Sequence, residues 1–488
     1  MNDDLLYSSI SELGKLLRAR KVSSLELARA YLARLETLGP KYNALATETR
    51  DLAEQQAGES DERLRRKQPC GPLEGIPYGV KDLLATKGIP TTWGSEPFRD
   101  QVFDYDATVI RKLRDGGGVL AAKLAMVPLA GGGGYRYSNP HLFGTCKNPW
   151  NPEHWAGGSS SGPTAAVSAA MVPFAIGSET GGSIVVAAAY TGITAVRPTY
   201  GLVSRFGAMA LSWTLDKLGP MCHSSEDCAL VLSVIAGDDP NDPSSSGRNF
   251  VYRPNSGHPL REIRVAFSAS DFSERAVDSA RPAFQEAVEV FRKMGVKLVE
   301  VSLPQLPYRQ VSGVIAGAEV STVFGPLISD PERFNLMRDE RQKSGLKNGL
   351  NIPATRYLQA TRIRRIIQER IREFFKQVDV VMCYTERNPA PRIDSEPPER
   401  PPGAGRGAGT ARPAQPRPAA GNTDLMGCSN LLGLPGITLP CGFSTGTNLP
   451  LGLHLVGRPF EEQLLFQLGN GFQKNTDWHL KRPPVGNA

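Results

Sequence analysis

The sequence predicts an α/β fold, in which short buried strands alternate with helices. From Gly71 onward the chain consists of short apolar runs separated by glycine and proline, for example over 118–123 and 172–177. Such runs are typical of strands that are buried on both faces of a sheet. A complete strand–helix–strand unit also lies between Ile263 and Val301. A chain of 488 residues can bury a substantial core without disulfides.

The chain opens with two predicted amphipathic helices, each preceded by a capping box. Ser9 and Glu12 precede the first apolar stripe, and Ser23 and Glu26 precede the second. The charged segment 51–67 follows, and its composition predicts an exposed helix.

The strand–helix–strand unit begins with a predicted strand over Arg264–Phe267. Its helix starts near Ala280, with Pro282 in the first turn, and stops at Gly295. The second strand covers 296–301. Further strands are predicted over 378–383, 437–439 and 451–456, and a closing amphipathic helix over 460–468.

The amino-acid composition of the chain argues against several classes of function. The seven cysteines are an odd number and widely spread, which predicts free thiols in a reducing compartment and no metal site. The N-terminus is acidic, and no apolar stretch approaches the roughly 20 residues of a membrane helix. The net charge of +7 comes from basic and acidic residues that are interspersed. We therefore expect a cytoplasmic protein with no membrane and no nucleic-acid partner.

The segment Asn388–Gly421 differs from the rest of the chain, because it is rich in proline, glycine, alanine and arginine. It cannot bury enough apolar surface to offset its ordering entropy, so we expect a flexible surface loop. A polyproline II ligand for a partner domain is the alternative.

The stretch 155–201 is almost uncharged and contains two serine–glycine clusters. The second cluster, 180–184, follows an apolar strand and precedes an apolar helix. This setting puts Ser183 near a helix N-terminus, where unpaired N–H groups favour negative charge. A nucleophile and its oxyanion hole can therefore share this loop. A phosphate-binding nest is the alternative, but the loop fits neither a P-loop nor a Rossmann fingerprint.

A nucleophilic serine needs a base, and the residues offer two arrangements. Gly158–Gly162 matches a GxSxG elbow around Ser160, which would require a preceding strand and a histidine downstream. The residues before it, NPWNPEHWA, indicate a turn. The other arrangement uses Lys81, which lies in the apolar segment GIPYGVKD, where burial would make a neutral amine available near pH 7. Taken alone, Lys81 would be interpreted as a solvated surface lysine.

Three segments together resemble the amidase signature family: GIPYGVKD, GGSSSG and GSETGGSI, in this order. AVRPTYGLVSRFG, LDKLGP, GLPGITLPCG and PLGLHLVGRPFEEQLL extend the similarity over most of the chain. The resemblance implies one large α/β domain over 1–488, with a mixed central β-sheet covered by helices on both faces. The helices of 1–70 would pack on it.

The resemblance also implies the roles of the site residues. Ser183 would be the acylated nucleophile, and Lys81 the general base acting through Ser159. The peptide bond Gly158–Ser159 would be cis. The oxyanion hole would consist of the backbone N–H groups of Thr180, Gly181, Gly182 and Ser183. No cofactor or metal is implied.

The sequence departs from the family pattern at three places. Val185 and Ala187 stand where the family often has arginine and proline. Val127 and Pro128 stand where many members carry an acidic residue, and the glycine run Gly131–Gly134 follows. These departures bear on the choice of substrate.

The sequence therefore predicts hydrolysis of a linear carboxylic amide in a small molecule, with esters or carbamates open to the same acyl chemistry. A homodimer would fit this family. The alternative is the amidase (glutaminase) subunit of a tRNA-dependent amidotransferase, which Val185 and the altered substrate loop disfavour. A non-catalytic binding protein on the same scaffold is the third hypothesis.

Overall fold

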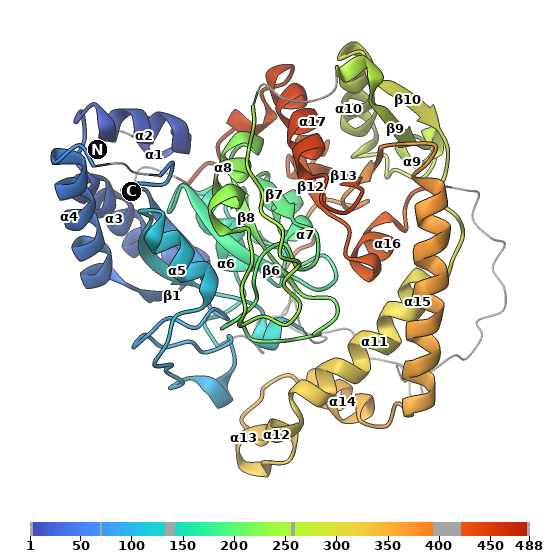
Figure 1. The fold of residues 1–488 in the computed structure, drawn as a ribbon, viewed down its shortest axis with the longest axis horizontal. Helices are drawn as coiled ribbons and strands as arrows, with labels where there is room; N and C mark the ends of the chain where they lie inside the picture. The colour runs from blue at the N-terminus through green and yellow to red at the C-terminus, as the bar shows by residue number, and fades with distance from the viewer. Residues whose placement is uncertain (1–2, 69–70, 132–141, 255–258, 394–420, 486–488) are drawn as a thin grey trace.

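The computed structural model describes residues 3–68, 71–131, 142–254, 259–393 and 421–485. In these residues one large mixed sheet has helices on both faces (Figure 1). The strands of this sheet are β1 (Leu45–Glu48), β2 (Pro77–Lys81), β3 (Val119–Leu124), β6 (Phe174–Glu179), β7 (Thr194–Arg197), β8 (Lys217–Cys222), β9 (Arg264–Phe267), β10 (Lys297–Glu300), β11 (Val380–Tyr384), β12 (Gly436–Phe443) and β13 (Pro450–Gly457). A separate two-stranded ladder joins β4 (Lys147–Asn148) and β5 (Asn151–Trp155).

The longer helices are α2 (Ile10–Arg18), α3 (Ser24–Tyr42), α4 (Arg50–Arg65), α5 (Thr108–Asp115), α6 (Ser161–Ser168), α7 (Val185–Thr191), α8 (Ser225–Ile235), α10 (Arg281–Lys293), α11 (Tyr308–Val323), α14 (Glu340–Gly349), α15 (Ala354–Phe374), α16 (Leu425–Leu432) and α17 (Glu462–Lys474). The shorter helices and helical turns are α1 (Asp3–Leu6), η1 (Glu96–Phe98), η2 (Pro128–Ala130), η3 (Leu260–Glu262), α9 (Ala269–Phe272), α12 (Gly325–Ile328), α13 (Pro331–Asn335) and η4 (Trp478–Leu480).

The large sheet has the strand order β1-β3-β2-β6-β8-β7-β12-β13-β11-β9-β10. Strands β3, β2 and β6 are parallel to one another, and so are β11, β9 and β10. The other neighbours are antiparallel. Gly79 of β2 pairs with Ala175 of β6, so the carboxyl ends of these two parallel strands lie side by side. Ligand sites of open α/β sheets lie beyond such ends.

Strand β6 shows how the two faces of the sheet are covered. Phe174 and Ile176 belong to a core that includes residues of α8 and α17. Ala175, between them, belongs to a second core that includes residues of α6 and α7. Successive strand residues point to opposite faces, so both faces are buried. The predicted α/β class, with helices on both faces, is confirmed.

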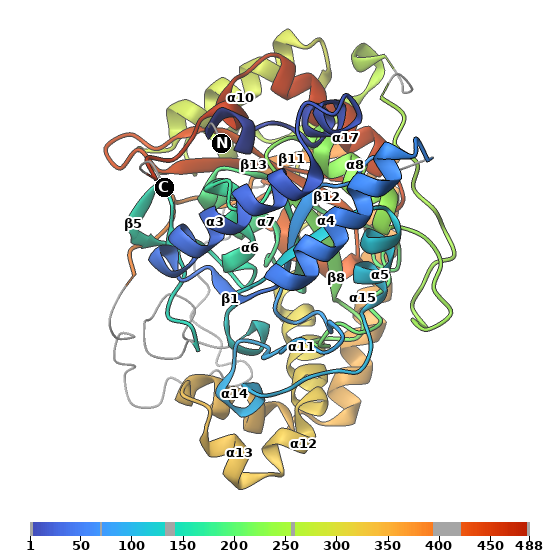
Figure 2. The same cartoon turned by 90° about the vertical axis from the view of Figure 1, so that its left-hand side faces the viewer.

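The N-terminal helices begin as predicted. Ser9 and Ser23 cap α2 and α3, and both capping boxes are complete. Helix α4 differs from the prediction of an exposed helix, because its face around Ala53 and Ala57 is buried. Their small side chains let α4 pack closely against β3. Figure 2 shows α3 and α4 side by side on this side of the molecule.

The strand–helix–strand unit is also confirmed, since β9, α10 and β10 follow one another and β9 pairs with β10 in parallel. The predicted strand over 437–439 was too short, because β12 continues through Pro440 to Phe443. A register shift between Pro440 and Gly442 accommodates these two residues, which sequence patterns treat as strand breakers.

The region from α11 to α15 projects away from the sheet (Figure 1). It was not anticipated from the sequence. Most of the predicted loop Asn388–Gly421 lies outside the described residues. Within the residues described, no helix combines the length and apolar character needed to cross a membrane. The six cysteines there are buried free thiols.

Candidate active site

Lys81 is the last residue of β2 and has a fully buried side chain. Its Nζ donates to three serine hydroxyls, those of Ser159 at 2.7 Å, Ser178 at 2.9 Å and Ser160 at 3.1 Å. Burial disfavours the charged ammonium and lowers the pKa of Lys81 to about 7, although Asp216 and Glu179 oppose this shift. Lys81 is therefore a buried amine able to exchange a proton near neutral pH.

The two serine clusters meet beside Lys81. Ser159 precedes α6, and its peptide bond with Gly158 is cis, as the resemblance implied. The backbone N–H of Ser160 donates to the carbonyl oxygen of Ser183 at 3.2 Å. Ser159 and Ser160 are buried, whereas Ser183 is partly exposed. Lys81 and Ser159 are thus in direct contact, and a backbone bond holds Ser183 beside them.

Among the described residues, the side-chain hydroxyl of Ser183 makes no hydrogen bond to Lys81 or Ser159. Catalytic hydrogen bonds often tighten when substrate binds, so we expect the bond between the hydroxyls of Ser159 and Ser183 to form in the substrate complex.

The glycine loop before α7 has the conformation that a small residue requires. Gly182 has a φ of +126°, and a Cβ there would come within 3.0 Å of the Val186 side chain. In the described part of the chain, the N–H groups of Gly181, Gly182 and Ser183 donate to no protein acceptor. They remain available for a ligand oxygen. Gly181 is exposed to solvent.

Glu179 is the last residue of β6. It was not identified as a site residue from the sequence. Its Oε2 accepts the backbone N–H groups of Ile184 at 2.8 Å and Val185 at 3.0 Å. Its Oε1 pairs with Arg197 at 2.8 Å, and both side chains are fully buried. A carboxylate therefore occupies the N-terminus of α7, directly beside the proposed nucleophile.

This ion pair keeps Glu179 ionised despite its burial. Burial alone would raise the pKa of Glu179, but Arg197, Lys217 and hydrogen bonds outweigh burial and lower it to about 2. Asn430 of α16 adds a hydrogen bond to Glu179 at 2.9 Å. The carboxylate is thus neutralised by Arg197 of β7. An acidic and a basic residue at the ends of two strands consecutive in sequence, Glu179 of β6 and Arg197 of β7, were the signal available in the sequence.

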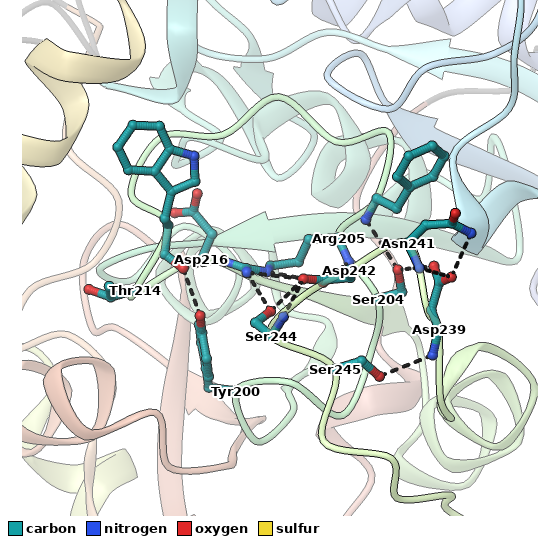
Figure 3. Close-up of polar contacts among 12 residues, drawn as sticks. Tyr200, Ser204, Arg205, Thr214, Asp216, Asp239, Asn241, Asp242, Ser244 and Ser245 are labelled. Atoms are coloured by element: carbon teal, nitrogen blue, oxygen red, sulfur yellow. Dashed lines mark hydrogen bonds and ion pairs between the residues drawn. The ribbon is translucent and has the colours of Figure 1, made fainter.

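A cavity of about 230 Å³ adjoins the start of the glycine loop. Ser178, Thr180 and Asp216 are among its lining residues, and the Thr180 hydroxyl donates to Asp216 at 2.6 Å. Arg205 and Asp242 lie on its wall and form an ion pair at 3.3 Å. Figure 3 shows both side chains with their hydrogen-bonding neighbours. The cavity therefore offers charged groups of both signs near the serines.

The segment before the glycine run is fixed to the site. Val127 donates its backbone N–H to the carbonyl oxygen of Ser159 at 3.2 Å. The buried amide of Gln342, from α14, donates to the carbonyl oxygens of Pro128 at 2.9 Å and Gly131 at 2.8 Å. The projecting helices thus support this segment. The rest of the glycine run, 132–134, lies outside the described residues.

Among the described residues, the alternative elbow around Ser160 lacks the histidine that its pattern requires. Its hydroxyl is buried, accepts from Lys81 and donates to the carbonyl oxygen of Ser178 at 3.1 Å. No histidine among the described residues contacts it. The prediction of a turn before this cluster holds only for Pro149 and Trp150, because Asn151–Trp155 forms β5. Pairing with β4 stabilises this short strand despite its polar sequence.

Two comparisons with known proteins, one with family models and one with curated proteins, agree on the family. The family model described as Amidase matches residues 26–466. Among curated proteins, the A subunit of the glutamyl-tRNA(Gln) amidotransferase of Methylococcus capsulatus is 36% identical, over 97% of this chain and 98% of the relative. The protein of the same name from Dechloromonas aromatica is 36% identical over 98% of this chain and 99% of the relative.

Solved structures share the fold. The peptide amidase of Stenotrophomonas maltophilia has a TM-score of 0.82 and 26% identity, over 98% of both chains. The A subunit of the glutamyl-tRNA(Gln) amidotransferase of Thermotoga maritima has a TM-score of 0.75 and 26% identity, over 100% of both chains.

These relatives correct the expectation about partners. The family resemblance implied a small-molecule substrate and was compatible with a homodimer, and the evenly mixed charges predicted no nucleic-acid partner. That prediction was wrong, since the relatives are named as a subunit of an enzyme that is itself named for glutamyl-tRNA(Gln). The physical reason is that the net charge of one chain does not report the partners of an assembly.

Family model, relatives and fold agree over nearly the whole length of the sequence. The chain belongs to the Amidase family.

Proposed function

We propose that this chain is the amide-hydrolysing subunit of a tRNA-dependent amidotransferase and that it releases ammonia from glutamine. The name and the extent of the relatives support this assignment. The proposed partners are accordingly other protein subunits and a tRNA. The observation that carries the chemistry is buried Lys81, which contacts Ser159 at 2.7 Å and has a pKa of about 7.

In the proposed reaction, neutral Lys81 accepts a proton from Ser159, which takes one from Ser183 as Ser183 attacks the amide carbon. The N–H groups of Thr180, Gly181, Gly182 and Ser183 stabilise the oxyanion, each donor contributing about 3 kcal/mol. The carbon–nitrogen bond breaks as the relay returns the proton to the leaving ammonia. Water then hydrolyses the acyl-enzyme to a carboxylic acid and free Ser183.

The charged cavity supports an amino acid as substrate. Glutamine carries an ammonium and a carboxylate in addition to its side-chain amide. Arg205 on the cavity wall is suited to a carboxylate, and Asp216 and Asp242 are suited to an ammonium. The cavity begins beside Thr180, so the side-chain amide would reach the glycine loop.

The test compares the chain alone with the chain co-expressed with its partner subunits. We expect glutamine hydrolysis that needs the partners and disappears in Ser183→Ala and Lys81→Met. The matched control is Lys87→Met, which removes an exposed lysine and leaves activity unchanged. Cleavage of simple amides by the isolated chain, with no glutamine hydrolysis in the complex, would overturn the assignment. Activity that survives Ser183→Ala would overturn the mechanism.

A further inference from the structure

A second cavity, of about 570 Å³, lies between the C-terminal end of α15 and the segment that follows α16. The two helices pack against each other (Figure 1). This volume falls in the range of about 300–1,000 Å³ typical of small-molecule sites. Its walls are apolar, formed by Ile371, Phe375, Leu432, Leu434 and Pro459.

The charged residues that line this cavity all carry the same sign. Arg372, Lys376 and Arg458 lie on it, and no aspartate or glutamate does. Lys376 pairs with Glu373, and Arg458 with Asp379. Arg372 has no carboxylate within 4 Å among the described residues, so its charge is open to a ligand. Apolar walls with a cationic rim suit a ligand that has an apolar chain and one anionic end.

We propose that this cavity binds an amphiphilic carboxylate, with its aliphatic chain against Leu432, Leu434 and Phe375 and its carboxylate on Arg372. Burial of the chain supplies most of the affinity. Arg372 then discriminates the acid from an uncharged molecule of the same length.

The wall of this cavity is also the support of the candidate active site. The carbonyl oxygen of Leu434 accepts from Arg197 Nε at 3.1 Å. Asn430, two residues before Leu432, donates to Glu179 at 2.9 Å. Segment 430–434 therefore faces the cavity on one side and holds the Glu179–Arg197 pair on the other. A ligand that shifts this segment changes the support of the loop that carries Ser183, which would couple the two sites.

Binding is tested by calorimetric titration of the full chain with decanoate. We expect saturable one-to-one binding of decanoate to the wild type. Decanol should bind the wild type at least tenfold more weakly, and decanoate should bind Arg372→Glu at least tenfold more weakly. The matched control is Arg370→Glu, because Arg370 is also exposed on α15 but lies outside the cavity lining. The affinity of this variant for decanoate should stay within twofold of that of the wild type. Both substitutions change exposed residues and should leave the fold intact. The melting temperature of each variant checks that it is folded. Failure of decanoate to bind, or equal affinity in wild type and Arg372→Glu, would contradict the site.

Coupling is tested by the rate at which a fluorophosphonate labels Ser183. Saturating decanoate should change this rate at least twofold in wild type, and the change should vanish in Arg372→Glu. A change that persists in that variant would mean that decanoate acts at the active site itself. Bound decanoate with no effect on labelling would overturn the coupling. The calorimetric result does not depend on Ser183 chemistry, so it stands or fails separately from the proposed function.

Discussion

At the scale of single residues, burial sets the charge of the groups around the serines in two opposite ways. Among the described residues, the hydrogen-bond partners of Lys81 are all hydroxyls, so burial lowers its pKa and favours the neutral amine. Glu179 has Arg197 as an ion-pair partner, and it remains a carboxylate despite complete burial. The site therefore combines a titratable base with a fixed negative charge.

Lys81 predicts a pH profile for the amide hydrolysis. Because the neutral amine is the active form, kcat/KM should fall about tenfold per pH unit below pH 7 and level off above it. The measurement is kcat/KM between pH 5 and 9 for the holo-complex. A profile that is flat through this range would show that Lys81 is not the base.

Glu179 predicts a large effect on stability. Glu179→Gln leaves Arg197 buried without its counter-charge, which should cost about 3–5 kcal/mol. The folded pKa of Glu179 lies below its ordinary value, so its stabilisation is present above pH 4.5 and is lost as the pH falls toward 2.

Urea unfolding at neutral pH measures this change. The control is Glu54→Gln, which breaks the exposed Arg29–Glu54 pair and should cost less than about 1 kcal/mol. Similar midpoints for the two variants would refute the structural role of Glu179.

At the scale of elements, the supports of the site come from helices that are distant in sequence. Helix α16 contributes Asn430 to Glu179, and α14 contributes Gln342 to the segment after β3. Buried Glu319 of α11 accepts hydrogen bonds from Thr214 and from Tyr357 of α15. The loop that contains Thr214 ends at Asp216, which binds Thr180. The projecting helices therefore support both sides of the site.

The capping box of α3 predicts a local loss of stability. Ser23→Ala removes the acceptor of the Glu26 N–H and should lower the free energy of unfolding by about 1 kcal/mol. Ser344→Ala, on an exposed position inside α14, is the control and should change stability by less than about 0.5 kcal/mol. Equal effects in thermal unfolding would indicate that the α3 cap does not contribute.

At the scale of the whole molecule, local stability should decrease from the central strands of the large sheet to its edge strands. Strands β6 and β8 are paired on both sides and almost completely buried, whereas edge strand β10 is partly exposed. Hydrogen exchange measured by mass spectrometry should therefore be slowest in 174–179 and 217–222, and faster in 297–300. Exchange in β10 as slow as in β6 would contradict this order.

Much of the fold could be predicted locally. Capping boxes, apolar runs and the pattern over 263–301 depend on neighbouring residues, and they gave α2, α3, β9, α10 and β10 close to their bounds. Strand β12 exceeded its prediction, because pairing with β13, through a register shift, accommodates a proline and a glycine that local rules exclude. The projecting helices were missed, since no motif drew attention to them.

What the sequence by itself determined is the family and the order of the motifs that contain Lys81, Ser159 and Ser183, because these signals are local. Only the tertiary structure decided that Lys81 is buried against three serine hydroxyls, and that Glu179, Arg197 and Asn430 support the glycine loop. The physical reason is that parallel pairing of β2 and β6 brings strand ends together across about a hundred residues. Burial and hydrogen bonding, which set these pKa values, exist only after that pairing has formed.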